Sequence, residues 1–215
     1  MGFWGCVVLL MGIGCVLPRS TPLAAGFIAD KAAVRGGLYA HSARGEEKLI
    51  GVHGTVMAPV NRHCGFNFVA GYVALDVFDK DAYYHETELG FDFVFGGGSR
   101  AKGGVVGFMG AGATFVGFGN FVKEGETQSF GAGYLRAGCQ ATIRAGKWLY
   151  LEPYFEWKGN SYFPVLFTLG TNLHFVLRDG KTSTTTLYTG LSVSSVTKSA
   201  SSQSWLWTAG FALFW

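Results

Sequence analysis

Nine charged or titratable side chains lie in segments where polar and apolar residues alternate. They are Glu86, Glu88, Asp92, Arg136, Arg144, Glu152, Glu156, His174 and Arg178. Carboxylates can act in acid–base catalysis, and carboxylates beside arginines can form ion pairs that neutralise charge away from water. Because successive side chains of a strand point to opposite faces, the two-residue period predicts that these nine share the polar side of a sheet.

We favour charge pairing, because no catalytic constellation accompanies the nine residues. His85 and Glu86 are adjacent, so they would face opposite sides of a strand. The cysteines lack metal-ligand spacing, and the glycine-rich segments do not complete a dinucleotide-binding motif. We therefore expect no enzymatic activity, no cofactor and no metal ion.

The composition indicates which elements must position these side chains. Of the 215 residues, 14% are charged, 16% are aromatic and 33 are glycine. Few charges with many aromatics and glycines favour closely packed strands and tight turns over helices, coiled coils or disorder. The net charge is +3 and no cluster of bases is interleaved with aromatic residues, so nucleic acid is not an expected partner.

Residues 1–25 have the features of a secretory signal peptide. Residues 3–17 are continuously apolar, which is long enough for a signal but short for a membrane helix. Small residues predict cleavage after Ala25, and Cys15 leaves lipidation open as an alternative. Cleavage would leave Cys64 and Cys139, which we expect to be unpaired rather than joined in a disulfide.

From Lys48 onward, nine alternating segments are separated by turn-forming residues. We predict strands at Leu49–Ala58, Phe66–Phe78, Tyr83–Gly96, Val105–Gly119, Ser129–Ala145, Trp148–Lys158, Tyr162–Arg178, Thr184–Val196 and Trp205–Trp215. The uncharged segment around Val105–Gly119 is also long enough for a membrane helix, but its frequent glycines favour a strand.

The positions of the lysines favour a membrane barrel over a water-soluble one. Every lysine of the mature chain falls in a turn or near the end of a predicted strand. A sheet face in water would carry lysines in mid-strand, whereas hydrocarbon outside and a narrow interior exclude them from that position. Open sheet edges are too costly in hydrocarbon, so the strands are expected to close into a barrel whose apolar faces contact lipid.

The last predicted strand carries a residue-specific pattern. Thr208, Gly210, Leu213 and Trp215 follow the order polar-x-Gly-x-x-hydrophobic-x-aromatic. In this pattern the chain resembles the small bacterial outer-membrane barrels of the OmpA, OmpX and OmpW type, whose assembly machinery reads it. The resemblance implies an all-β, up-and-down antiparallel transmembrane barrel in the bacterial outer membrane, with lipid and that machinery as partners. The charged interior is more similar to the OmpA type than to the OmpW type.

Strand number is open between eight and ten. The resemblance implies that both termini lie in the periplasm, which requires an even number of strands. Residues 26–47 are either a periplasmic extension or contribute an extra strand at Val34–Ala43, which would be the tenth. Eight strands result if the whole segment before Cys64 is a periplasmic extension. We expect eight strands by analogy with the family, within a barrel at residues 48–215, and keep ten as the alternative.

The expected function is envelope structure or narrow, porin-like passage of small solutes. We expect the acids and bases to pair inside as a plug rather than to line an open pore, because a small barrel is about filled by its own side chains. The alternatives are a surface barrel that binds a host ligand, an outer-membrane enzyme and a soluble secreted barrel. Arginine should be costly at lipid-facing Leu169 and much less costly at inward-facing Thr168.

Overall fold

The computed structural model describes residues 32–43, 47–77, 82–99, 103–119, 127–160, 165–196 and 199–215. They form the strands β1 (Ala33–Ala43), β2 (Glu47–Asn61), β3 (Cys64–Val77), β4 (Ala82–Ser99), β5 (Gly103–Gly119), β6 (Thr127–Arg144), β7 (Leu149–Asn160), β8 (Leu166–Asp179), β9 (Thr184–Val196) and β10 (Ser199–Phe214). The expected signal peptide at residues 1–25 lies outside the described residues. Within the described ranges, no helix is long and apolar enough to cross a membrane, and the segment considered above as a helix is β5.

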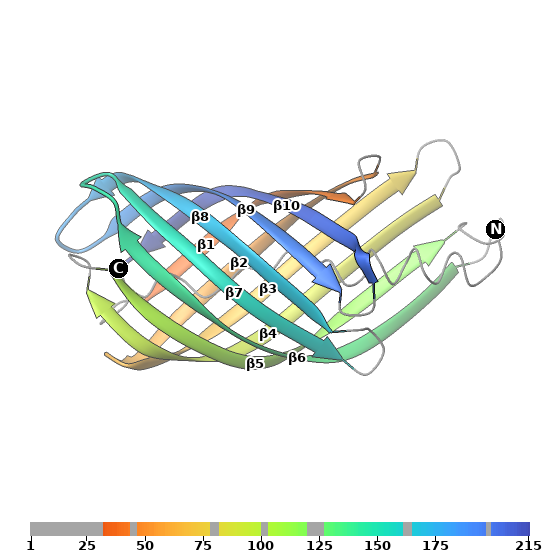
Figure 1. Cartoon of the computed structure of the whole chain (residues 1–215), viewed down its shortest axis with the longest axis horizontal. Coiled ribbons are helices and arrows are strands. Elements are labelled where there is room, and N and C mark those ends of the chain that lie inside the picture. The colour runs from red at the N-terminus through yellow and green to blue at the C-terminus, as the bar shows by residue number, and fades with distance from the viewer. Residues whose placement is uncertain are drawn as a thin grey trace.

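The ten strands form one closed antiparallel barrel, in which each strand pairs with its neighbours in sequence (Figure 1). β1 completes the circle, because all 11 of its residues pair with β2 on one side and with β10 on the other. Without β1, the facing backbone groups of β2 and β10 would lack partners, which hydrocarbon does not tolerate. The expectation of eight strands with a periplasmic extension is therefore wrong, and the alternative of ten is confirmed. The barrel begins at Ala33, not at Lys48.

The strands present apolar side chains outward and mainly polar or aromatic side chains inward, as the two-residue period predicts. On β4, Phe91 is exposed whereas its neighbour Asp92 is fully buried. On β8, Leu169 is 64% exposed whereas Thr168 is 6% exposed. An apolar exterior around a polar interior reverses the arrangement of a water-soluble domain and is typical of transmembrane barrels.

The interior is filled with apolar side chains at the end of the barrel that carries the C-terminus. We call this set the apolar plug; it consists of Ala33, Met57, Val94, Val106, Phe108, Tyr150, Val176, Ala212 and Phe214. The members come from β1, β2, β4, β5, β7, β8 and β10, so they surround the axis rather than coat one side. These side chains therefore occupy the interior at this end of the barrel with apolar groups.

Tyrosine rings inside the barrel lie against glycines of neighbouring strands. A Cβ atom added to Gly170 of β8 would lie 2.5 Å from the ring of Tyr154 on β7 and 2.6 Å from Cβ of Ser192 on β9. Glycine at this position lets the ring pack directly on the backbone of the next strand. The same relation holds for Gly112 of β5 and the hydroxyl of Tyr134 on β6.

Replacing Gly170 by alanine should therefore destabilise the barrel by about 1–3 kcal/mol, because the new methyl group overlaps Tyr154 and Ser192. Gly133→Ala is the matched control, since its Cβ would meet no heavy atom nearer than 3.9 Å; its stability should change by less than about 1 kcal/mol. Urea titration of the barrel refolded in lipid vesicles measures both effects. Equal losses for the two variants would contradict this packing.

Candidate functional site

Seven of the nine titratable residues singled out from the sequence lie inside the barrel. They are Glu86, Glu88, Asp92, Arg136, Glu152, Glu156 and His174, all almost completely buried. Arg35 of β1, His53 of β2 and Lys158 of β7 lie among them and are also buried. We call these ten side chains the lumen network. It draws on β1, β2, β4, β6, β7 and β8, so it extends around most of the wall.

One ion pair of the lumen network joins β4 to β6 across the strand between them. Arg136 Nε donates to Asp92 Oδ1 at 2.6 Å, and Arg136 Nη2 donates to Asp92 Oδ2. Gly110 of β5 lies in register with both residues, and its missing side chain lets the guanidinium reach over the strand. Asn67 Nδ2 adds a third hydrogen bond, to Asp92 Oδ2 at 2.7 Å. Paired, bidentate geometry of this kind compensates for burying both charges.

A second group of contacts converges on one carboxylate oxygen, Glu152 Oε2. Arg35 Nη1 donates to it at 3.0 Å and Asn172 Nδ2 at 3.0 Å. His174 Nε2 lies 3.1 Å from the same oxygen, while its Nδ1 lies 2.9 Å from Thr186 Oγ1. Because β1 and β7 are separated by three strands in the circle, the contact between Arg35 and Glu152 spans the interior. This contact fixes opposite parts of the wall relative to each other.

The third ion pair joins Lys158 of β7 to Glu88 of β4. Lys158 Nζ donates to Glu88 Oε1 at 3.1 Å. The same Nζ lies 3.8 Å from the ring centroid of Tyr134 on β6, within range of a cation–π interaction. The lumen network thus contains five carboxylates, three strong bases and two histidines.

Arg144 and Arg178, predicted to be inside, are not in the lumen network. Arg144 lies at the end of β6, where its Nε donates to the carbonyl of Gly146 at 3.1 Å. Arg178 is exposed, because the β8–β9 register shifts between Val176 and Arg178. This bulge inserts one residue, so the alternation that held up to Val176 is reversed for Arg178. The alternation of inward and outward residues in the sequence does not reveal such an insertion.

Three members of the lumen network were missed by the sequence analysis. Arg35 and His53 lie in β1 and β2, which the preferred eight-strand interpretation placed outside the barrel. Alternation could have found Arg35, because Val34 and Leu38 face outward and Tyr39 inward. The sequence places Lys158 at the end of a predicted strand. It lies two residues before the end of β7, but its side chain points inward to Glu88.

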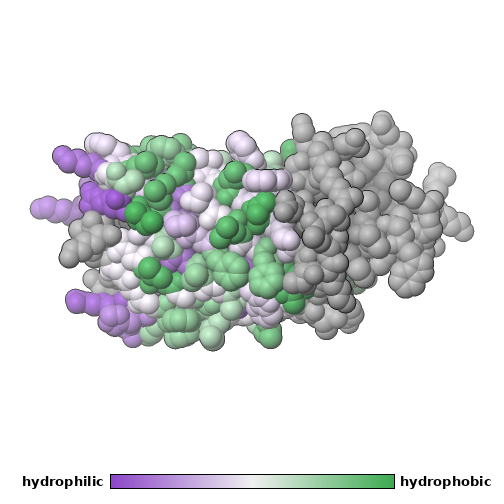
Figure 2. Space-filling model, viewed as in Figure 1, coloured by the Kyte–Doolittle hydropathy of each residue, from purple (hydrophilic) through white to green (hydrophobic). Residues whose placement is uncertain are grey.

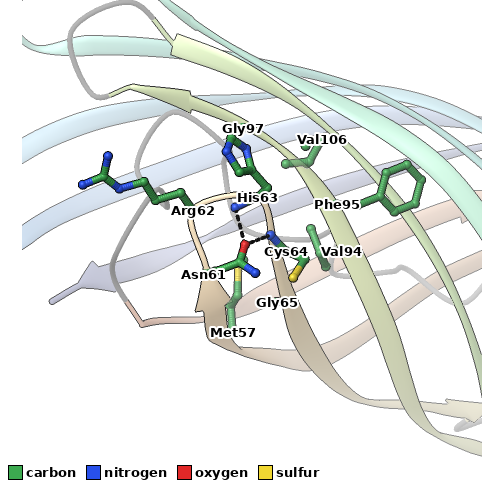
Figure 3. Close-up of a pocket in the computed structure, with 11 residues that line it drawn as sticks. Met57, Asn61, Arg62, His63, Cys64, Gly65, Val94, Phe95, Gly97 and Val106 are labelled. Carbon is green, nitrogen blue, oxygen red and sulfur yellow. Dashed lines mark hydrogen bonds between the residues drawn. The ribbon is translucent and has the colours of Figure 1, made fainter.

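A small cavity lies beside the β2–β3 turn, near the apolar plug (Figure 3). Asn61 Oδ1 accepts hydrogen bonds from the backbone N–H groups of His63 and Cys64, at 2.7 and 3.0 Å, and so shapes the turn. The cavity volume is about 10 Å³, which holds about one water molecule.

Cys64 and Cys139 are both free thiols. Among the described residues, no group of His, Cys, Asp or Glu side chains could hold a metal ion.

Thr208, Gly210 and Leu213 of the C-terminal pattern lie on β10, between β9 and β1, and Trp215 directly follows the strand. Thr208 points into the barrel, whereas Leu213 and Trp215 are on the outer surface. Gly210 pairs with Gly37 of β1, where a Cβ would collide with the backbone of Gly36. The last strand therefore forms the closing seam of the barrel.

Exposed apolar side chains lie on the outer face of all ten strands. Figure 2 shows hydrophobic residues over the wall of the barrel and hydrophilic residues gathered at one end, on the left of the view. Exposed examples include Leu38, Val52, Phe115, Leu191 and Trp207. A closed antiparallel barrel with this exterior and an ion-paired interior belongs to the architectural class of transmembrane β-barrels.

Comparison with known proteins agrees with this class at the level of the fold. The structure is similar to that of the outer membrane protease OmpT from Escherichia coli, with a TM-score of 0.50, 7% identity, and coverage of 93% of this chain and 98% of that chain. The chain thus shares the fold of bacterial outer-membrane β-barrels.

Other solved barrels match with lower scores. Ail, the attachment invasion locus protein of Yersinia pestis, has a TM-score of 0.41 and 11% identity, covering 86% of this chain and 97% of that chain. A major outer membrane protein from Thermus thermophilus has a TM-score of 0.42 and 14% identity, covering 86% and 99%. No family model and no curated protein matches the sequence.

Proposed function

We propose that the chain is an integral outer-membrane protein whose closed interior serves the structure of the envelope rather than solute flow. The observation that carries this proposal is the combination of the apolar plug with ion pairs that cross the interior. A hydrated solute would have to displace packed side chains at one end and separate buried charges further along. Both steps are costly.

The exterior supports the membrane part of the proposal. Large apolar side chains such as Leu169 and Phe211 are about 60% exposed, and a monomer in water would leave a very large apolar surface uncovered. Lipid acyl chains are therefore the proposed partner of the wall. The strand that bears Thr208, Gly210, Leu213 and Trp215 is the proposed contact for the barrel assembly machinery, as the sequence resemblance implies.

Planar-bilayer recordings on the refolded mature chain test the closed interior. The protein should run faster on a gel unboiled than boiled, which shows that it has folded, and should give no regular conductance steps. Regular steps from heat-modifiable protein would overturn the closed interior. Protein that stays water-soluble without detergent and runs identically before and after boiling would overturn the membrane barrel itself.

A narrow cation pathway is the second candidate. Five carboxylates against three strong bases give the described interior an excess of negative charge, which favours cations over anions in a narrow polar pore. The same recordings decide between the two, because a pathway of this kind would pass potassium in preference to chloride.

The proposal assigns no catalytic role to the barrel. Glu86 points into the interior and is 1% exposed, whereas the adjacent His85 is on the outer surface. The two side chains therefore cannot act together on one substrate. Binding of a surface ligand would depend on the connections at residues 44–46, 78–81, 120–126, 161–164 and 197–198, which lie outside the described residues.

A further inference from the structure

Four basic residues gather at the end of the barrel that carries the C-terminus. Arg144 and Lys147 lie at the β6–β7 turn, and Arg178 and Lys181 lie at the β8–β9 turn. The two turns are neighbours, because the backbone N–H of Val176 on β8 donates to the carbonyl of Trp148 at 3.0 Å. We call these four residues the basic patch.

The basic patch has a clear excess of positive charge. Asp179 is the single acidic residue in the two turns, and Thr184 Oγ1 donates to it at 3.2 Å. One carboxylate can balance at most one of the four bases. Lys147, Arg178 and Lys181 are exposed, whereas Arg144 is half-buried at the edge of the apolar plug, with its guanidinium 5.7 Å from the ring centroid of Tyr150.

Large exposed apolar side chains lie directly beside the basic patch. Trp148 is 65% exposed and follows Lys147; Leu177 is 56% exposed and precedes Arg178. Ile143, which precedes Arg144, is also exposed. The bulge in β8 is what places Leu177 and Arg178 on the surface together. Phosphate groups, the membrane interface and acyl chains are the parts of a membrane that contact basic, tryptophan and aliphatic side chains respectively.

From this arrangement and charge we propose that the basic patch binds the headgroup of an acidic phospholipid in the adjacent leaflet. The inference rests on the proposed membrane function, and under the orientation that the family resemblance implies this leaflet is the periplasmic one. Bases close to an acidic lipid surface contribute about 1 kcal/mol each, and the apolar side chains below hold the acyl chains of the same lipid. Charge and exposed hydrocarbon together favour a lipid over a free phosphate ion.

Native mass spectrometry of the refolded mature chain, offered equal amounts of phosphatidylglycerol and phosphatidylethanolamine, tests the proposal. Wild-type protein should retain phosphatidylglycerol about tenfold over phosphatidylethanolamine, which allows for screening of four charges. The variant R144Q/K147Q/R178Q/K181Q should lose this preference. The charge-conserving variant R144K/K147R/R178K/K181R should keep it, and millimolar inorganic phosphate should not compete.

Several outcomes would overturn the inference. They are equal retention of both lipids by folded wild-type protein, an unchanged preference in the glutamine variant, or full competition by inorganic phosphate, which would indicate a simple anion site. If the glutamine variant does not fold, the wild-type preference must still fall when sodium chloride is raised from about 0.05 to about 0.5 M. Wild-type protein that is not heat-modifiable contradicts the proposed function itself, whereas folded protein without lipid preference contradicts only the basic patch.

Discussion

Replacing Asp92 by alanine is expected to cost about 3–5 kcal/mol of unfolding free energy, among the largest effects of any single substitution in the barrel. The substitution leaves the guanidinium of Arg136 buried without the carboxylate that receives its Nε and Nη2 hydrogens. A buried charge that loses its partner keeps its full desolvation cost. Urea titration of the barrel in lipid vesicles, followed by tryptophan fluorescence, measures the loss.

The double variant D92A/R136M separates charge pairing from simple packing. Removing both charges should recover at least half of the stability lost in D92A, because no buried guanidinium is left without the carboxylate of Asp92. An exposed acid provides a further control, since D179A should cost less than about 1 kcal/mol. A loss below about 1 kcal/mol for D92A, or no recovery in the double variant, would contradict the ion-paired interior.

Alternation was sufficient to predict most of the wall, because a strand between lipid and a polar lumen must alternate along its whole length. β4 and β7 illustrate this: their acids and their phenylalanines fall on opposite faces in the sequence and in the structure. β1 was harder. Gly36 and Gly37 interrupt its pattern, and its place depends on pairing with β10, which lies at the other end of the chain. Closure of that kind is a long-range property that local periodicity does not contain.

The candidate site was predicted less completely than the fold. The polar faces identified the acids, but not their partners, because contacts such as Arg35 with Glu152 depend on which strands face each other across the barrel. Arg178 shows a different limit: one inserted residue at the β8 bulge moves its side chain to the surface. Lys158 shows a third limit of sequence-based prediction. A position near the end of a strand does not determine whether a long side chain turns inward.

Thr168→Arg, expected from the sequence to be well tolerated, should instead be destabilising. Thr168 is buried, and its hydroxyl lies 2.9 Å from Ser194 Oγ. A much larger side chain would displace Ser194 and lose this contact. Thr168 therefore cannot serve as the control for a substitution on the lipid face, and a position on the outer surface of the same strand is needed.

Leu169→Arg should cost about 2–4 kcal/mol, because it places a charge in the middle of the hydrocarbon layer. Leu169 is 64% exposed on the outer face of β8, and it pairs with Phe155 near the middle of β7 and with Val193 of β9. Its neighbours on the wall are therefore apolar, and it lies eight residues further from the C-terminal end of the barrel along β8 than Leu177 does. Urea titration in vesicles gives the loss for this variant relative to wild type.

Leu177→Arg is the matched control, since it makes the same change on the same outer face of β8 but beside Arg178 at the barrel end. There the guanidinium reaches the headgroups, so the cost should be only about 0–1 kcal/mol. A water-soluble barrel would show no dependence on depth, because both side chains would face the same solvent. Equal costs at Leu169 and Leu177 would therefore count against a membrane around the wall, whereas a difference of about 2 kcal/mol or more, larger at Leu169, follows only if hydrocarbon surrounds the middle of the barrel.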